Sequence, residues 1–105
     1  MSVAIPETFQ LAGGTWKVRI VSKAKMQRVV ECFKDECQGA CSVHKRTIYI
    51  LDGMDAHTTE WTFYHELGHA IRAVLGYEDS EENHAELDGW ASMVQQFLAS
   101  KKGKL

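Results

Sequence analysis

The sequence lacks the long apolar segments that a membrane protein requires. Its 105 residues contain no run of about 18 apolar residues, and segment 1–14 has no basic residues followed by a continuous apolar stretch. Neither a membrane-spanning helix nor a secretory signal is therefore indicated. We expect a soluble, cytoplasmic protein without a membrane partner.

A strong excess of either charge is also lacking. Twelve Lys and Arg residues are balanced by 14 Asp and Glu residues, which gives a formal net charge of −2. Bulk electrostatic binding to nucleic acid needs a strongly basic surface, so no nucleic-acid partner is expected. Repeats and low-complexity segments are missing as well. The length fits one domain, 1–105, in which segments 1–13 and 100–105 are expected to be loosely ordered ends.

Cysteine is scarce and odd in number. Cys32, Cys37 and Cys41 have no secretory context, so reduced thiols are expected. Together with His44 they form the pattern C-x4-C-x3-C-x2-H, which offers four ligands of the kind that a structural zinc uses. The spacing matches none of the usual two-residue zinc turns. We therefore interpret the three cysteines as buried or half-buried thiols instead.

Hydrophobic periodicity predicts an α+β domain with the element order β-α-β-β-α-α. Apolar and polar residues alternate over 15–21, with Trp16, Val18 and Ile20 on one side, which indicates a half-buried strand. The segments 40–43 and 47–51 are typical of two strands that form a hairpin. Between them and the first strand, apolar residues three and four apart predict a helix that Gly39 ends; they are Met26, Val29, Val30, Phe33 and Cys37.

Two further helices are predicted after the hairpin. The first ends at Gly76, and the second follows the segment 77–83. Each helix is preceded by residues that can cap its first turn. The candidates for the first helix are Asp55, Thr58 and Thr59, and those for the second are Asp79 and Ser80. The apolar stripe of the second helix consists of Leu87, Trp90, Ala91, Val94 and Leu98. The two helices must therefore pack together, with a small sheet against the first of them.

The helix that ends at Gly76 contains the motif H-E-x-x-H, formed by His65, Glu66 and His69. Residues four apart lie one above the other on a helix, so the two imidazoles can bind one Zn²⁺ at about 2.0–2.1 Å. Glu66 is rotated about 100° from His65, so it reaches a water on the open zinc position rather than the metal. There the carboxylate can act as a general base. Gly68 is expected to leave a gap that a strand or a substrate can approach.

A catalytic zinc needs a third protein ligand. His84 lies one turn before Leu87 at the edge of the apolar stripe, and Asp88 lies one turn after His84. These two residues can supply a ligand and a supporting carboxylate on one helix face. Glu86 lies at the opposite edge of the stripe and is the alternative ligand. The two assignments differ by about half a turn of the helix.

The segments "TIYIL", "EWTFYHELGHAI" and "HAELDGWA" together resemble the ImmA/IrrE family of small zinc metallopeptidases and related phage-type minimal zincins. In that family a helix with H-E-L-G-H is followed by a helix with E-x-x-A-[ND]-x-F-A, whose first Glu is the third ligand. The resemblance covers residues 39–98 and implies a zincin-like fold. The family's ligand position falls on His84, so this chain departs from the family by offering a histidine there.

The motif and the resemblance imply a zinc-dependent endopeptidase with Glu66 as the catalytic residue and with His65, His69 and His84 as ligands of Zn²⁺. Its partner is then a protein or peptide substrate, which pairs as an extended chain with the strand 47–51. One alternative is a zinc-stabilised interaction module without turnover. Another is a metal-dependent nuclease, whose pattern H-x3-H-x5-H requires a histidine where Leu75 stands. The substrate and the oligomeric state stay open.

Overall fold

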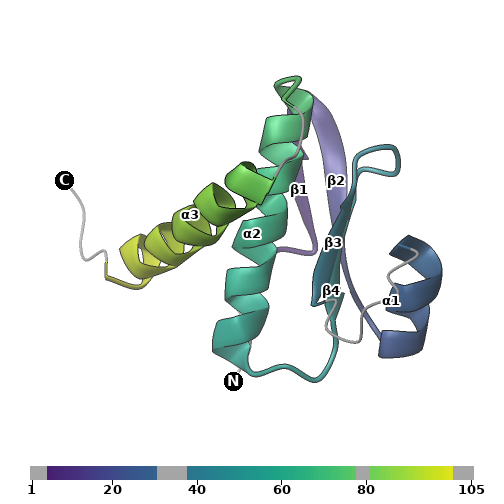
Figure 1. Cartoon of the computed structure of the whole chain (residues 1–105). Coiled ribbons are helices and arrows are strands. Elements are labelled where there is room, and N and C mark those ends of the chain that lie inside the picture. Colours follow the sequence, from purple (N-terminus) through teal and green to yellow (C-terminus); the bar gives the residue numbers. More distant parts are fainter. Residues whose placement is uncertain (1–4, 31–37, 78–80, 101–105) are drawn as a thin grey trace.

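The structure is a computed structural model that describes residues 5–30, 38–77 and 81–100. In these residues the chain forms an α+β fold with one four-stranded sheet (Figure 1). The elements in chain order are β1 (Thr8–Leu11), β2 (Gly14–Val21), α1 (Lys23–Val30), β3 (Gly39–Ser42), β4 (Thr47–Leu51), α2 (Ala56–Val74) and α3 (Glu81–Ser100). The α+β class was predicted correctly, but the predicted order lacked one strand, β1.

The expectation that segment 1–13 is loosely ordered is wrong for β1. Thr8–Leu11 pairs antiparallel with the beginning of β2, and the ring of Phe9 stacks on that of Trp16 with 6.0 Å between centroids. Ala12 and Gly13 both have positive φ, 51° and 76°, which is the geometry of the tight two-residue turns that favour glycine. Residues 1–4 and 101–105 lie outside the described part of the chain.

The interior strand of the sheet beside α2 is β4. The strand order is β1-β2-β4-β3, in which β2 and β4 are parallel and the other pairs are antiparallel. Ile48 and Ile50 face α2, whereas Tyr49 packs on the other face with Met26 of α1. Both faces of β4 are therefore covered, and Figure 1 shows α1 and α2 on opposite sides of the sheet.

Two expectations about the strands and α1 are not met. Ile20 was placed on the buried side of its strand, but it is exposed because α2 packs on β3 and β4 and not on the end of β2. Gly39 was expected to end the first helix, but it begins β3. The described part of α1 ends at Val30, so Phe33 and Cys37 lie outside the described residues.

The motif helix α2 has defined signals at both ends. Its N-cap is Asp55, which was one of the three predicted candidates. The carboxylate of Asp55 accepts a hydrogen bond of 2.7 Å from the backbone N–H of Thr58. At the other end Gly76 has φ 87°, and its N–H donates to the carbonyl of Ala73 at 3.0 Å. This glycine-dependent cap ends the helix where the sequence predicted.

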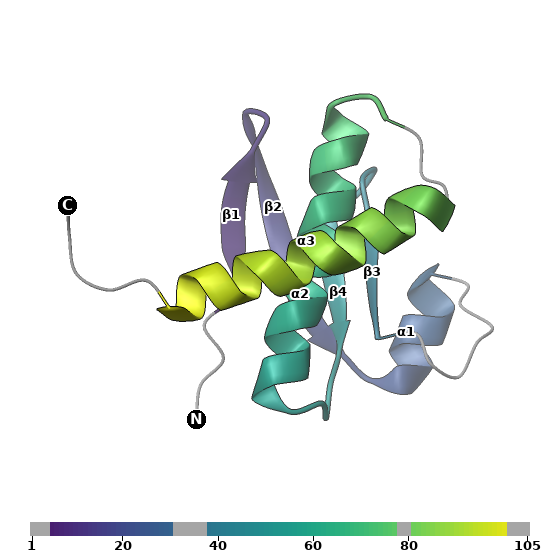
Figure 2. The ribbon, with the colours of Figure 1, turned by 60° about the vertical axis from the view of Figure 1, so that its left-hand side comes forward.

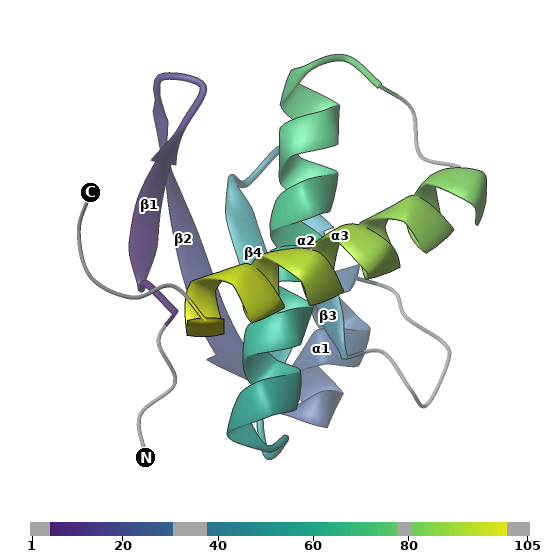
Figure 3. The same ribbon diagram turned by 90° about the vertical axis from the view of Figure 1, so that its left-hand side faces the viewer.

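α3 crosses α2 on the side of α2 that faces away from the sheet (Figures 2 and 3). The helices meet at Gly68, where an added Cβ would collide with the side chain of Leu87. The gap expected at Gly68 is therefore filled by α3 itself. Leu87 and Ala91 are buried as predicted, but Trp90 is 37% exposed because it lies at the rim of the contact, with one side of its ring near Gly68 and the other side free of α2. The candidate caps Asp79 and Ser80 lie outside the described residues.

We predict that Gly68→Ala lowers the free energy of unfolding by about 1 kcal/mol. Overpacking against Leu87 costs about 1–3 kcal/mol, which exceeds the gain of about 1 kcal/mol in helix propensity. Gly89→Ala is the matched control, because a Cβ on Gly89 meets nothing within 4 Å and should stabilise α3 by about 0.5–1 kcal/mol. Urea unfolding measures both changes. A Gly68→Ala protein more stable than the parent would contradict this packing of α3 on α2.

Candidate metal centre

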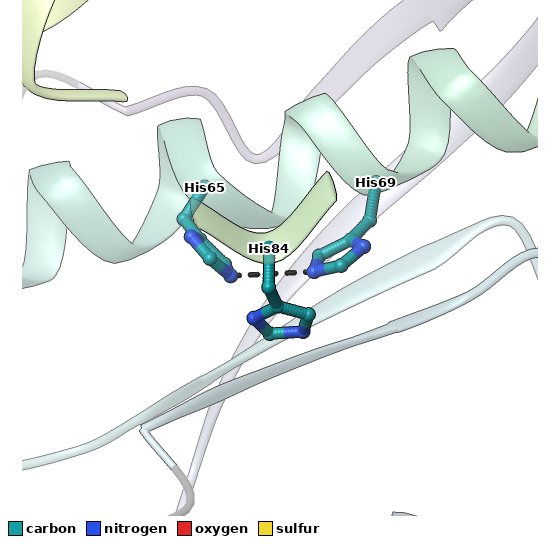
Figure 4. Close-up of side chains that lie close together, drawn as sticks. All are labelled: His65, His69 and His84. Carbon is teal, nitrogen blue, oxygen red and sulfur yellow. Dashed lines mark hydrogen bonds between the residues drawn. The ribbon is translucent and has the colours of Figure 1, made fainter. Parts of the chain in front are cut away.

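His65 and His69 lie one turn apart on the side of α2 that turns toward the beginning of α3. Their Nε2 atoms are 3.2 Å apart, and Figure 4 shows the two rings inclined toward each other. Two nitrogens at about 2.0–2.1 Å from a tetrahedral Zn²⁺ would be about 3.3 Å apart. The spacing of the two nitrogens thus fits two ligands of one metal ion.

His84 comes from the first turns of α3 and completes a three-histidine cluster (Figure 4). Its ring centroid lies 5.2 Å from that of His65 and 4.7 Å from that of His69. One ligand atom from each of the three side chains lies within 4.8 Å of the others, which is close enough to bind one metal ion. The cluster forms because His84 stands three residues before Leu87, on the part of α3 that meets α2.

The donor set fits a transition metal and leaves room for a fourth ligand. Three imidazoles are a known catalytic set for Zn²⁺, and imidazole also suits Cu, Fe and Ni. Among the described residues, no other group of His, Cys, Asp and Glu side chains meets the same spacing. The residues present therefore fit the metal centre that the sequence predicted, although they do not identify the metal.

His65 is held in place by residues from both helices. Its Nδ1 lies 2.9 Å from Oδ1 of Asp88 on α3, as the sequence predicted for a supporting carboxylate, although the N–H is not aligned with that oxygen. The ring of Trp61 stacks on the other side with 5.3 Å between centroids. Trp61 is in turn fixed by its indole N–H, which donates to Oγ of Ser92 at 3.0 Å.

Burial lowers the pKa of His65, and the neighbouring His69 lowers it further, whereas Asp88 acts in the opposite direction. The folded chain therefore favours the neutral ring, which is the form that binds a metal. The unfolded chain takes up a proton at a higher pH than the folded chain does. Acidification through the ordinary pKa range of histidine consequently removes stability at this residue.

Glu66 is buried between α2 and the edge strand β3. Its Oε2 lies 3.1 Å from the position that a Cβ on Gly39 would take, and its Cγ lies 3.0 Å from that position. The same imaginary Cβ would be 2.6 Å from Cγ2 of Thr62. Gly39 thus lets the backbone of β3 approach the motif helix closely, which was not predicted from the sequence.

Two hollows flank Glu66 and His84, and both residues line each of them. One hollow, of about 260 Å³, is further lined by Gln38, Gly39, Trp61, Thr62, His65 and Asp88. The other, of about 250 Å³, is further lined by Cys41, Val43, His69 and Ala73. Residues of β3 border both hollows, so the candidate site lies along this strand. The hydroxyl of Thr62 is buried in the first hollow without a hydrogen-bond partner.

Of the remaining sequence candidates, Glu86 lies apart from the three histidines and Cys41 lies near them. Glu86 is exposed and lines a different hollow with Ile71 and Arg72, beyond Leu87. Cys41 borders the hollow beside His69, whereas Cys32 and Cys37 lie outside the described residues. The alternative cysteine site therefore stays untested.

The place of three residues beside the histidine site was not predicted from the sequence. Trp61 stands four residues before His65, so helical spacing carried a signal that this ring lies against the motif histidine. Gly39 and Cys41 carried no such signal, because their position depends on the pairing of β3 with β4.

Comparisons with known proteins add no assignment to this geometry. No protein-family model matches the chain, and neither a curated protein nor a solved structure matches it. The resemblance to the ImmA/IrrE family is thus a hypothesis that rests on residues 39–98 alone. In the described part of the chain, no helix has both the length and the apolar character needed to cross a membrane.

We predict that the purified protein binds about one Zn²⁺ per chain and that His84→Ala weakens this binding more than about 100-fold. Loss of a supporting residue typically costs 10–100-fold in metal affinity, and loss of a ligand should exceed this. Glu86→Ala is the control from the same helix, and it should leave the affinity unchanged because Glu86 lies beyond Leu87. Competition with a chromogenic chelator measures both. Loss of zinc from the Glu86 variant with retention by the His84 variant would refute the assignment.

Proposed function

We propose that the protein is a zinc-dependent endopeptidase. The observation that carries the proposal is the convergence of three imidazoles beside a buried glutamate at the edge of a sheet. His65, His69 and His84 would hold the metal. Bound Zn²⁺ would act as a Lewis acid that lowers the pKa of a water molecule toward 7.

Glu66 is proposed as the general base. Its carboxylate would accept a proton from the water that attacks a peptide carbonyl, and it would return the proton to the leaving amine. The placement of Glu66 supports this role, because it follows His65 on α2 and lines both hollows. Its burial against Gly39 would limit the positions that the carboxylate can take.

The proposed substrate-binding edge is β3. The sequence placed an extended substrate on the strand 47–51, but this strand is β4, which has β2 on one side and β3 on the other. That expectation is therefore corrected, because an interior strand has no edge to offer. In the described part of the chain, β3 has a neighbouring strand on one side only. A peptide that pairs with its other side would pass along the two hollows that flank Glu66.

We predict that Glu66→Gln retains zinc and the fold but loses at least two orders of magnitude in cleavage rate. The substitution keeps the size of the side chain and removes the group that takes up the proton. The assay incubates zinc-loaded protein with a mixture of unstructured peptides and identifies new termini by mass spectrometry. Glu60→Gln is the matched control, because Glu60 is on the same helix but lines neither hollow beside the histidines.

Equal cleavage by the parent and the Glu66 variant would refute the peptidase mechanism. A parent that binds zinc and cleaves no peptide would favour the alternative of a zinc-stabilised interaction module instead.

A further inference from the structure

Three large apolar side chains of α3 are exposed along one side of the helix. Trp90, Met93 and Phe97 expose 37%, 68% and 64% of their surface. Their spacing of three and four residues places them on one stripe of the helix. Leu87 and Ala91, which pack on α2, point to another side. We call these three exposed residues the α3 stripe.

The α3 stripe differs in its continuity from the exposed apolar residues on and beside the sheet. Ile20 on β2 and Val43 after β3 are single residues, and scattered exposure of this kind needs no explanation. Contiguous aromatic and methionine side chains are, by contrast, typical of interaction surfaces. Figure 3 shows α3 as the outermost layer over α2, so a partner can reach the helix from outside.

We propose that the α3 stripe pairs with the same stripe of a second copy of this chain, with the two helices antiparallel. Met93 lies near the middle of the stripe and would face its counterpart close to the twofold axis. Trp90 of one copy would then lie beside Phe97 of the other, and the same contact would recur on the other side of the axis. The stripe is thus complementary to itself.

The charge distribution favours the antiparallel arrangement. The first half of α3 carries four acidic residues, Glu81, Glu82, Glu86 and Asp88, and the helix contains no Lys or Arg. The second half of the helix carries no charged side chain. An antiparallel pair keeps the two acidic halves apart, whereas a parallel pair would bring these like charges together.

A hollow beside the α3 stripe offers a place for a partner's side chain. It has a volume of about 270 Å³. Its apolar lining comes from Trp90, Ile71, Leu87 and Gly68, and its charged lining from Arg72 and Glu86. Phe97 of a second copy, lying beside Trp90, would reach this apolar hollow. A large side chain seated in a pocket is the usual anchor of a protein interface.

The proposed dimer does not depend on the peptidase function. His84 lies on the side of α3 that meets α2, so pairing through the stripe leaves the candidate metal centre accessible. Three exposed side chains per copy form a small interface, near the lower end of specific interfaces. We therefore expect a dissociation constant in the micromolar range.

The test uses two opposite charges at position 93. Met93→Glu and Met93→Lys would each place like charges at the twofold axis, so each variant should be monomeric at concentrations at which the parent is a dimer. An equal mixture of the two variants should dimerise again, because Glu and Lys then face each other. Sedimentation velocity over the micromolar range measures all three samples. Ile20→Glu is the control, which should dimerise like the parent because Ile20 lies on β2.

Three outcomes would overturn the proposal. They are a parent that stays monomeric throughout this range, variants that dimerise as well as the parent, and a mixture of variants that stays monomeric. The last result would mean that the stripe does not pair with itself. Zinc content and the circular dichroism spectrum, measured on every variant, should match those of the parent.

Discussion

The packing of Leu87 against Gly68 is the contact on which the candidate metal centre depends. His65 and His69 belong to one helix, so the helix itself sets their spacing. His84 reaches them only when α3 lies close to α2, and the missing Cβ of Gly68 allows that approach. This apolar contact, together with the bond from Trp61 to Ser92, thus sets how close the helices lie and where the third imidazole stands.

The sheet determines where the chemistry would take place. β4 is buried on both faces and holds α2 against the sheet, while β3 brings backbone to within contact distance of Glu66. The protein thereby places a carboxylate between its nitrogen ligands and an edge of the sheet. Trp61 and Asp88 add a second constraint, since they contact the ring of His65 from different helices.

The sequence predicted the parts of the site that follow from helix geometry. Spacing along α2 paired the motif histidines, and the phase of α3 left His84 and Glu86 as alternatives, of which the structure brings His84 beside them. Strand order was beyond such reasoning, because β2 and β4 pair across a long connection. β1 was not predicted, because its four residues are too few to show a clear alternation of apolar and polar side chains. The exposure of Trp90 depends on the angle at which α3 crosses α2, and an apolar stripe in the sequence does not define that angle.

The distribution of ligands over two helices couples metal affinity to local folding. α3 makes its main contacts with α2, and Ala91 joins the core beside Ile48 and Ile50, so the place of His84 depends on this packing. A molecule in which α3 had separated from α2 would offer only two imidazoles. The apparent affinity is consequently the intrinsic affinity scaled by the fraction of molecules in which α3 is packed. By reciprocity, an ion held by all three imidazoles would favour the packed state of α3 over the separated state by the ratio of its affinities for the two states, so this helix would link metal binding to folding.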